Sequence, residues 1–275
     1  MLINIVAGHN ARVAAFRRDL FRGTADYYDQ FRVPYPASLI DDLSVRAALT
    51  GSGTLLDLAC GTGHLAFALH SRFARIWAVD QEPDMIEVVA RKAAAAGLSI
   101  RTTAASAEQL DLAQASIELV AIGNAFHRFD RDTVAGLIHR WLRPGGHVAL
   151  AWGGGPQDNA PSVSPAPWQR ALRAVLLRWR PPDRIPSGYD RDRTARPDSA
   201  VLTQAGFRYL DKREFTVAHE WTIESLLGHA HSTAVLSRQA LGETAADFAA
   251  DLRRTLLPHA PFRHQLSFAC ELASR

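Results

Sequence analysis

The chain has 275 residues, of which 47% are hydrophobic and 21% are charged, with a net charge of +3 at pH 7. This length and composition fit a globular protein with one large α/β domain, or with a domain that carries a sizeable insert. The chain is mildly basic but contains no dense block of Lys and Arg residues, which argues against a nucleic-acid-binding tail. No apolar run reaches about 18 residues, so no membrane span is expected.

Two further features concern the cellular compartment. Cys60 and Cys270 both fall in apolar segments, which predicts no disulfide framework and a reducing environment. Residues 1–6 lack the basic flank and the long apolar core of a signal peptide. We therefore expect a cytoplasmic protein.

The first half of the chain begins with helices and continues as an α/β alternation. Residues 9–50 are expected to form two or three helical pieces, interrupted at Pro34 and Pro36. Beyond them we expect strands at 54–59, 75–80, 100–104, 117–122 and 146–152, and helices at 63–72, 84–95 and 131–142. Such alternation predicts a parallel, doubly wound sheet with right-handed crossovers. Ligands bind such a sheet beyond the carboxyl ends of its strands.

The second half of the chain first departs from this alternation of strands and helices and then returns to it. Residues 153–198 begin with three glycines and are rich in Pro, Ser and Arg around an expected helix at 166–179. Because structureless loops of that length are unusual in a compact domain, we expect a folded insert or lid. Beyond it we expect a helix ending near 206, strands at 207–218 and 265–272, and helices at 222–229 and 243–257. The last two strands should pair antiparallel, as the sixth and seventh of one mainly parallel sheet.

This order predicts four regions. They are a helical cap at 1–50, a ligand-binding core at 51–152, an insert or lid at 153–198, and a segment at 199–275 that completes the sheet and carries a substrate-side helical insert at about 219–260.

The segment 55–67 reads as a buried strand, a glycine turn and the start of a helix. Gly61 and Gly63 allow positive φ and let a ligand approach the backbone, where the N–H groups of the next helix point. This pattern alone would also fit a nicotinamide dinucleotide. However, Asp57 suits an ammonium group better than a pyrophosphate, and Asp80 can accept from both hydroxyls of a ribose. A ligand with a cationic amino-acid end and a nucleoside end is predicted, and S-adenosylmethionine fits this description.

Five segments in order then carry a resemblance to a known family. They read LDLACGTG at 56–63, AVDQEPDM at 78–85, ASAE at 105–108, NAFH at 124–127 and LRPGG at 142–146. With them the chain resembles the class I S-adenosylmethionine-dependent methyltransferases over about residues 25–152. The resemblance implies a Rossmann-like α/β fold and S-adenosylmethionine as the cofactor.

The resemblance also implies a set of cofactor-binding residues. Asp57 and the glycine turn would line the methionine part, Asp80 would bind the ribose, and residues 106–108 would lie by the adenine. At Ser106 the family often has Asp to bind the adenine amino group. The full set that we assign to the cofactor is Arg32, Asp57, Ala59, Gly61, Gly63, Asp80, Gln81, Met85, Ser106, Ala107, Glu108 and Asn124.

Two segments resemble a subgroup of type 11 and type 25 small-molecule methyltransferases of secondary metabolism. They are YYDQFRVPYP at 27–36 and NAFHRFD at 124–130. The first would fold over the cofactor with Arg32 near its carboxylate. Alternatively, its aromatic residues only pack the N-terminal helices and Arg32 makes a surface salt bridge. The resemblance favours methylation of an amine or hydroxyl of a natural product, with an amino sugar of an aminoglycoside antibiotic as a candidate.

His127 is the candidate catalytic residue. Methyl transfer needs mainly alignment, but the acceptor also loses a proton, which a neutral histidine can take. Because His127 follows the strand at 117–122, it could act as a general base, position the substrate or make a structural hydrogen bond. The substrate-binding candidates are Tyr28, Tyr35, His127, Trp152, Tyr189, His229 and His231.

Several alternatives remain open. His229 and His231 could simply belong to a polar loop, and we predict no metal because no further ligands stand at suitable spacing. His64 and His70 are expected to be structural or exposed. The competing functions are methylation of a quinone or carboxylic acid, a nicotinamide dehydrogenase, a nucleic-acid or protein methyltransferase, and a non-catalytic cofactor- or partner-binding protein. We expect a small-molecule substrate and no nucleic-acid or membrane partner. The acceptor and the oligomeric state are not predicted.

Overall fold

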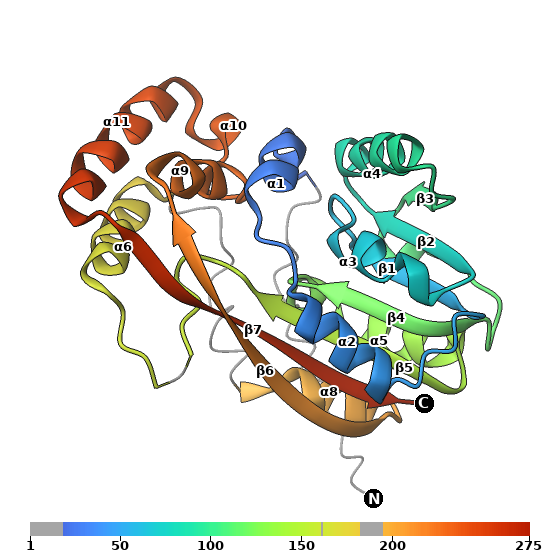
Figure 1. Ribbon diagram of the computed structural model, residues 1–275. Coiled ribbons are helices and arrows are strands. Elements are labelled where there is room, and N and C mark those ends of the chain that lie inside the picture. Colours follow the sequence, from blue (N-terminus) through green and yellow to red (C-terminus); the bar gives the residue numbers. More distant parts are fainter. Residues whose placement is uncertain (1–18, 161, 182–194) are drawn as a thin grey trace, which may run out of the picture.

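The computed structural model describes residues 19–160, 162–181 and 195–275. Its centre is one seven-stranded sheet with the order β3-β2-β1-β4-β5-β7-β6 (Figure 1). The strands are β1 (Thr54–Leu58), β2 (Arg75–Asp80), β3 (Arg101–Ala104), β4 (Ile117–Gly123), β5 (Leu142–Gly153), β6 (Arg208–Trp221) and β7 (Phe262–Ser274). The first five are parallel, and β7 is antiparallel to both β5 and β6. The predicted Rossmann-like sheet with an antiparallel last strand is therefore confirmed.

The helices lie close to their expected positions. They are α1 (Ala25–Phe31), α2 (Ala37–Arg46), α3 (His64–Ala68), α4 (Pro83–Ala96), α5 (Arg131–Trp141), α6 (Pro167–Trp179), α8 (Asp198–Gln204), α9 (Ile223–His231), α10 (Arg238–Leu241) and α11 (Ala245–Leu256). The helix expected at 63–72 is shorter and ends in a separate 3₁₀ turn at His70–Arg72. The short helix α10 was not expected. Strand β5 begins earlier than predicted because Leu142 already pairs with Ile117.

Helices cover both faces of the sheet because side chains alternate along each strand. Leu55 of β1 joins the buried cluster that contains Leu65 of α3. The next residue, Leu56, joins the opposite cluster with Ile138 of α5 and Val201 of α8. This two-sided burial accounts for the nearly continuous apolar sequence of the central strands.

The strand order reverses between β1 and β4, which are neighbours in the sheet. The chain after β1 runs to β2 on one side, whereas the chain after β4 runs to β5 on the other. Open α/β sheets bind ligands outside the carboxyl ends of the strands at such a point. The candidate site is thus expected around residues 59–63 and 123–128.

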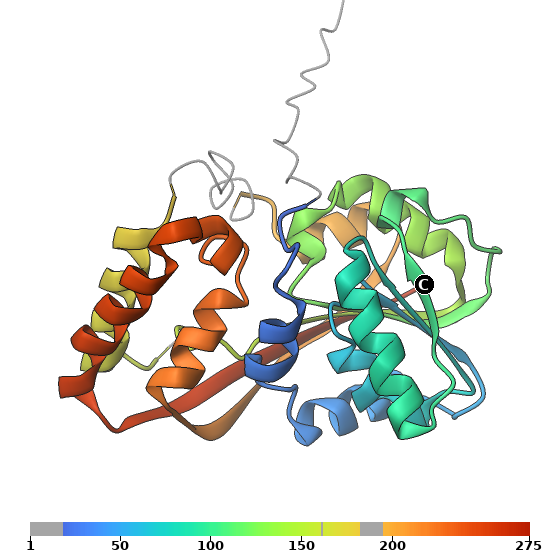
Figure 2. The ribbon, with the colours of Figure 1, turned by 90° about the horizontal axis from the view of Figure 1, so that it is seen from above.

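A group of helices made of α6, α9, α10 and α11 lies beside the sheet, at the extended ends of β6 and β7 (Figure 2). The Arg178 guanidinium and the Trp179 indole N–H of α6 both donate to the Asp251 carboxylate of α11, at 2.7 and 2.8 Å. The Trp179 ring also packs 5.9 Å from that of Phe248. The two segments expected as inserts therefore contact each other, although they are far apart in the sequence.

Helix α1 lies between this helical group and α4 (Figure 2). On one side, Gly228 of α9 is so close to Phe31 that a Cβ added there would lie 2.3 Å from the Phe31 ring. On the other side, the Lys92 ammonium of α4 pairs with the Asp29 carboxylate at 2.5 Å. Contacts with both neighbours hold α1 in place.

Replacing Gly228 with alanine is expected to destabilise the protein. The added methyl group overlaps the base of the Phe31 ring, and such overpacking costs about 1–3 kcal/mol. Gly136 of α5 is the matched control, because a Cβ added there meets nothing within 4 Å and should stabilise the helix by about 0.5–1 kcal/mol. Chemical denaturation measures both changes. Equal stability of Gly228→Ala and the wild type would contradict the close packing of α1 on α9.

Three further observations concern the residues that the structure describes. No helix among them is long and apolar enough to cross a membrane. Cys60 and Cys270 are buried free thiols. No group of three or more His, Cys, Asp or Glu side chains in these ranges is arranged to hold a metal ion.

Candidate functional site

The turn that follows β1 has an unusual backbone. Ala59, Gly61 and Gly63 have φ values of +54°, +53° and +84°. Positive φ is uncommon for a residue with a side chain and is often found at functional sites. A Cβ on Gly61 would lie 3.3 Å from the ring of Tyr28. Glycine thus allows both the conformation of the turn and the close approach of a neighbour.

Asp80, at the end of β2, holds this turn from one side. Its Oδ2 accepts the Gly61 N–H at 2.8 Å and its Oδ1 accepts the Glu82 N–H at 3.0 Å. Burial raises the pKa of the Asp80 carboxyl, and these two hydrogen bonds oppose the rise. A carboxylate has about four acceptor positions, so each Asp80 oxygen can still accept one more hydrogen bond. This arrangement fits the two hydroxyls of a ribose.

Asp57 of β1 is the second carboxylate at the turn. It is only 1% exposed, and its Oδ2 accepts the backbone N–H of Ala66 at 2.8 Å. Burial, with a smaller effect of Asp80, raises the pKa of the Asp57 carboxyl to about 7. A ligand ammonium group would favour the ionised form and lower this pKa. The buried Asp57 therefore fits the cationic end of an amino acid.

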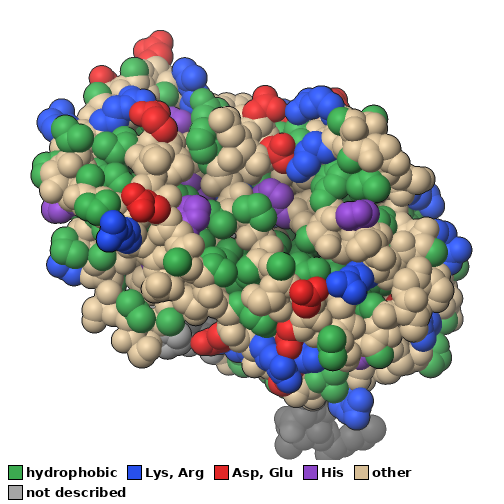
Figure 3. Space-filling view, in the orientation of Figure 1, with side chains coloured by type: hydrophobic (Ala, Val, Ile, Leu, Met, Phe, Trp, Pro, Cys, Tyr) green, Lys and Arg blue, Asp and Glu red, His purple; other side chains and the backbone are tan. Residues whose placement is uncertain are grey.

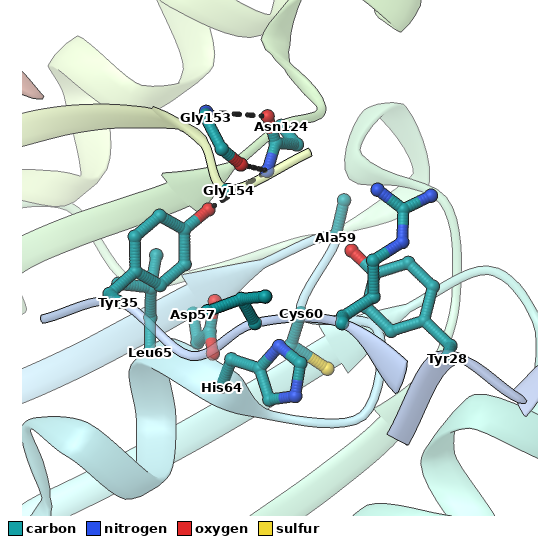
Figure 4. A pocket seen from close by; sticks show the side chains of 13 residues that line it. Tyr28, Tyr35, Asp57, Ala59, Cys60, His64, Leu65, Asn124, Gly153 and Gly154 are labelled. Carbon is teal, nitrogen blue, oxygen red and sulfur yellow. Dashed lines mark hydrogen bonds between the residues drawn. The ribbon is translucent and has the colours of Figure 1, made fainter. Parts of the chain in front are cut away.

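A cavity opens beside these groups at the carboxyl ends of β1 and β4 (Figure 4). The cavity is partly open to solvent. Its lining comes from α1 and the segment after it, from β1, the turn after it and the start of α3, and from the ends of β4 and β5 with the residue after each. The lining residues are Tyr28, Arg32, Val33, Tyr35, Asp57, Ala59, Cys60, His64, Leu65, Gly123, Asn124, Gly153 and Gly154. The site thus joins segments from residues 28–154 at the switch point of the sheet.

Asn124 organises one wall of the cavity (Figure 4). Its Nδ2 donates to the Tyr35 hydroxyl and to the Gly153 carbonyl, both at 3.3 Å, and its Oδ1 accepts the Gly153 N–H at 3.2 Å. Asn124 has a φ of +53°. These bonds connect the end of β4 with the segment after α1 and with the end of β5.

Two side chains of the α1 region extend over the glycine turn. The Tyr28 ring contacts Gly61 and stacks 5.8 Å from the ring of His64. The Arg32 guanidinium lies 4.8 Å from the centre of the Tyr28 ring, and its Nε donates to the Ser232 hydroxyl at 2.8 Å. The alternative that the aromatic residues of 27–36 only pack the N-terminal helices is therefore too narrow, since Tyr28 and Tyr35 also line the cavity.

His64 corrects another expectation. We expected a structural or exposed side chain, but its ring lines the cavity and points toward the interior, beside Cys60 (Figure 4). Burial, with the nearby Lys92, lowers the pKa of His64 to about 4, so the ring is neutral. Its place directly after Gly63, at the start of the helix that follows the turn, is the sequence signal.

The residues assigned to the adenine side lie outside the cavity lining. Met85 is buried on α4 in the small cluster that Tyr28 packs against, whereas Gln81 is exposed. Ala107 is buried in a 3₁₀ turn, and the Ser106 hydroxyl before it donates to Gln109 at 3.1 Å. Glu108 in the same turn is exposed. Gly61, Gly63 and Asp80 are absent from the lining too, although the two glycines shape the turn and Asp80 accepts the Gly61 N–H.

Trp152 and His231 are not where we expected them. Trp152 packs with the cluster on the α5 side of the sheet, because it alternates with Ala151, which faces the opposite cluster. The His231 ring packs against Tyr27 and Phe248. Neither side chain lines the cavity, and contact of either one with the acceptor stays a prediction.

The remaining predicted residues have mixed outcomes. His127 is half-buried in a 3₁₀ turn, where its Nε2 accepts from the Arg128 Nε at 3.4 Å, and it does not line the cavity. His229 is buried near Gly155, just beyond the cavity. Tyr189 lies outside the described residues. Figure 3 shows several histidine side chains across the middle of one face, between the helical group and the sheet.

Comparisons with known proteins match the segment that carries most of this site. Residues 55–146 match a family model described as a methyltransferase domain. An uncharacterized methyltransferase of Mycobacterium tuberculosis is 34% identical over 139 residues, which cover 50% of this chain and 54% of that protein. A demethylmenaquinone methyltransferase of Thermus thermophilus is 36% identical over 99 residues, 35% of this chain and 45% of that protein. This chain spans about half the length of the curated relatives it matches.

The fold comparison covers more of the chain. A protein from Anaeromyxobacter dehalogenans, proposed to be a type II methyltransferase, superposes with a TM-score of 0.53 at 25% identity. The match covers 89% of this chain and 97% of that one. Together the comparisons support the resemblance to class I S-adenosylmethionine-dependent methyltransferases. The natural-product subgroup stays a prediction.

Proposed function

We propose that this protein transfers a methyl group from S-adenosylmethionine to an amine or hydroxyl of a small molecule. The observation that carries the proposal is the pair of buried carboxylates, Asp57 and Asp80, on either side of a positive-φ turn at the switch point. One carboxylate fits an ammonium group and the other fits a ribose. Bound there, S-adenosylmethionine would supply an electrophilic methyl group on a good leaving group.

The proposed cofactor contacts divide along the site. Asp57, Ala59 and the glycine turn would hold the methionine part, and Arg32 above the turn would face its carboxylate. Asp80 would hold the ribose, with Gln81, Met85 and residues 106–108 toward the adenine. Asn124 would fix the wall beside the methyl group through its bonds to Tyr35 and Gly153.

The acceptor would enter from the side of α1 and the helical group. Tyr28 and Tyr35 line this side of the cavity and would contact it. An amino sugar is one candidate, which follows from the resemblance of residues 27–36 and 124–130 to natural-product enzymes. A quinone-like aromatic acceptor is the second candidate, and it is supported by the match to a demethylmenaquinone methyltransferase.

Calorimetry and a transfer assay test the proposal. We expect S-adenosylhomocysteine to bind with a Kd on the order of micromolar, within the range typical of enzyme ligands, and NADH not to bind. Radiolabelled S-adenosylmethionine should then label at least one member of a panel of aminoglycosides, phenols and reduced quinones. Binding of NADH in place of S-adenosylhomocysteine would contradict the cofactor assignment. Cofactor binding with no labelled product would favour a non-catalytic binding protein.

A further inference from the structure

We propose that His229 takes up the proton of the acceptor, and that the acceptor is an aromatic hydroxyl compound seated between the cavity and α9. This inference rests on the proposed methyltransferase function. It differs from the expectation that His127 is the base. It also selects a hydroxyl over an amine.

The first observation is an unmet hydrogen bond. The His229 side chain is 8% exposed, and its Nε2 has no hydrogen-bond partner among the described residues. Its ring packs edge-on against Trp221, with 5.7 Å between the ring centres. Buried polar atoms are nearly always paired, so an unpaired one needs an explanation. A bound ligand that presents a hydroxyl to Nε2 would provide the missing partner.

The second observation is where Nε2 lies. A Cβ added to Gly155 would lie 3.7 Å from His229 Nε2 and 2.9 Å from Asp158 Oδ2. The two preceding residues, Gly153 and Gly154, line the cavity. The backbone of three consecutive glycines thus runs from the cavity to His229, with the Asp158 and Phe268 side chains beside it.

The charges around His229 favour a neutral base. Burial and the Arg32 guanidinium hold the pKa of His229 well below its ordinary value. The ring is therefore neutral near pH 7, with one nitrogen unprotonated. A negative charge on Asp158 would oppose the effect of Arg32 on His229. However, burial raises the pKa of the Asp158 carboxyl, and the Asp158 Oδ2 already accepts the Gly155 N–H at 2.7 Å. Although the cofactor carboxylate would also face Arg32, an ammonium acceptor beside this guanidinium would be disfavoured relative to a neutral hydroxyl, and the anion formed from the hydroxyl would be attracted to it.

His127 is less suited to this step. Its Nε2 already accepts a hydrogen bond from the cationic Arg128 side chain, which occupies the lone pair that a base would use. It also stands outside the cavity lining. A role in positioning remains open to it.

The surroundings of the glycine segment favour a flat acceptor. A Cβ on Gly154 would lie 2.7 Å from the Phe268 ring, whose centre is 5.9 Å from that of Tyr35. Tyr28 lines the same cavity. Phe268 itself is buried in the core, so Tyr28 and Tyr35 form the aromatic walls, which suit a ring that stacks while the polar groups at His229 orient its hydroxyl.

The proposed step balances as follows. The acceptor hydroxyl gives its proton to His229 Nε2, its oxygen bonds to the methyl carbon, and the electrons of the broken carbon–sulfur bond stay on sulfur. His229 becomes an imidazolium and later releases the proton to solvent. The net products are the methyl ether, S-adenosylhomocysteine and one proton.

A binding experiment with 4-nitrophenol tests the inference without turnover. The full chain is saturated with S-adenosylhomocysteine and titrated with 4-nitrophenol at neutral pH, and the phenolate is followed by its visible absorbance. We expect binding, with a larger ionised fraction in the bound probe than in the free probe. His229→Gln should remove most of this increase, because glutamine can hydrogen-bond but cannot take a proton. His229→Phe should also weaken binding about tenfold or more.

His219→Gln is the matched control. His219 packs on the same Trp221 ring, at 4.5 Å, but from the outer strand β6, so its replacement should leave binding and ionisation unchanged. Unchanged S-adenosylhomocysteine affinity would show that each variant is folded. Absence of 4-nitrophenol binding to the wild type, or full ionisation in His229→Gln, would overturn the inference. If His127→Ala loses the increase in ionised 4-nitrophenol and His229→Gln keeps it, His127 is the base. Failure of S-adenosylhomocysteine to bind the wild type would instead count against the proposed function.

Discussion

Replacing Gly61 with alanine is expected to weaken S-adenosylhomocysteine binding by about a hundredfold, which corresponds to about 2.8 kcal/mol. The backbone at Gly61 has a φ of +53°, and a Cβ there would lie 3.3 Å from Tyr28. The methyl group would therefore strain the turn and occupy the surface along which the ligand approaches. It would also disturb the N–H that Gly61 donates to Asp80, the residue proposed to hold the ribose. Calorimetric titration measures the loss.

Gly97→Ala is the control for strain alone. Gly97 ends α4 with a φ of +65°, and a Cβ added there meets nothing within 4 Å. Both variants should lose about 1–2 kcal/mol of folding stability through the left-handed backbone. Only Gly61→Ala should lose ligand affinity. If both bind S-adenosylhomocysteine as the wild type does, the turn after β1 is not the ligand-binding surface.

The parts of the fold that follow from local pattern were predicted well. Apolar runs such as 54–59 and 117–122 are long enough to show buried strands, and the strand-helix alternation then limits the sheet to few topologies. The early start of β5 was missed because Pro144 and two glycines normally end a strand. It pairs nonetheless, since Leu142 lies opposite Ile117. The short helix α10 is too brief to leave a periodic signal.

The candidate site was predicted in part, and the errors have a common cause. Asp57, Asp80 and the glycines were found because their chemistry and spacing are local. The facing direction of Trp152 depends on the register of β5 with its neighbours, which the sequence does not show. Likewise, the unmet hydrogen bond of His229 arises only when α9 packs near a glycine segment some 70 residues away in the chain.

Helix α1 is the element that joins these distant parts. Its residues contact the glycine turn through Tyr28, α4 through Asp29 and α9 through Phe31. Just after it, Arg32 lines the cavity, and its Nε donates to the Ser232 hydroxyl beyond the end of α9. Binding of the cofactor and positioning of the acceptor would therefore depend on the same helix. A change at the contact between α1 and α9 should affect both ligands.

The affinity for S-adenosylhomocysteine is expected to increase as the pH rises through about 7. The Asp57 carboxyl has a pKa of about 7 in the free protein, because it is buried. An ammonium group favours the carboxylate, so binding lowers this pKa and releases a proton. Below pH 7 the affinity should fall by up to about tenfold per pH unit, and above pH 7 Asp57 should contribute no further change. Calorimetry at pH 6 in buffers of different ionisation enthalpy should detect close to one proton released.

Asp57→Asn isolates the group responsible. Its amide oxygen can still accept the Ala66 N–H, so the turn should persist, but the charge is lost. We expect about tenfold weaker binding at pH 8 and a nearly flat pH dependence between 6 and 8. Asp132→Asn, which removes an exposed carboxylate paired with Arg196, should keep the wild-type pH dependence. If Asp57→Asn keeps that dependence as well, another group titrates, and the ammonium of the ligand is held elsewhere than at Asp57.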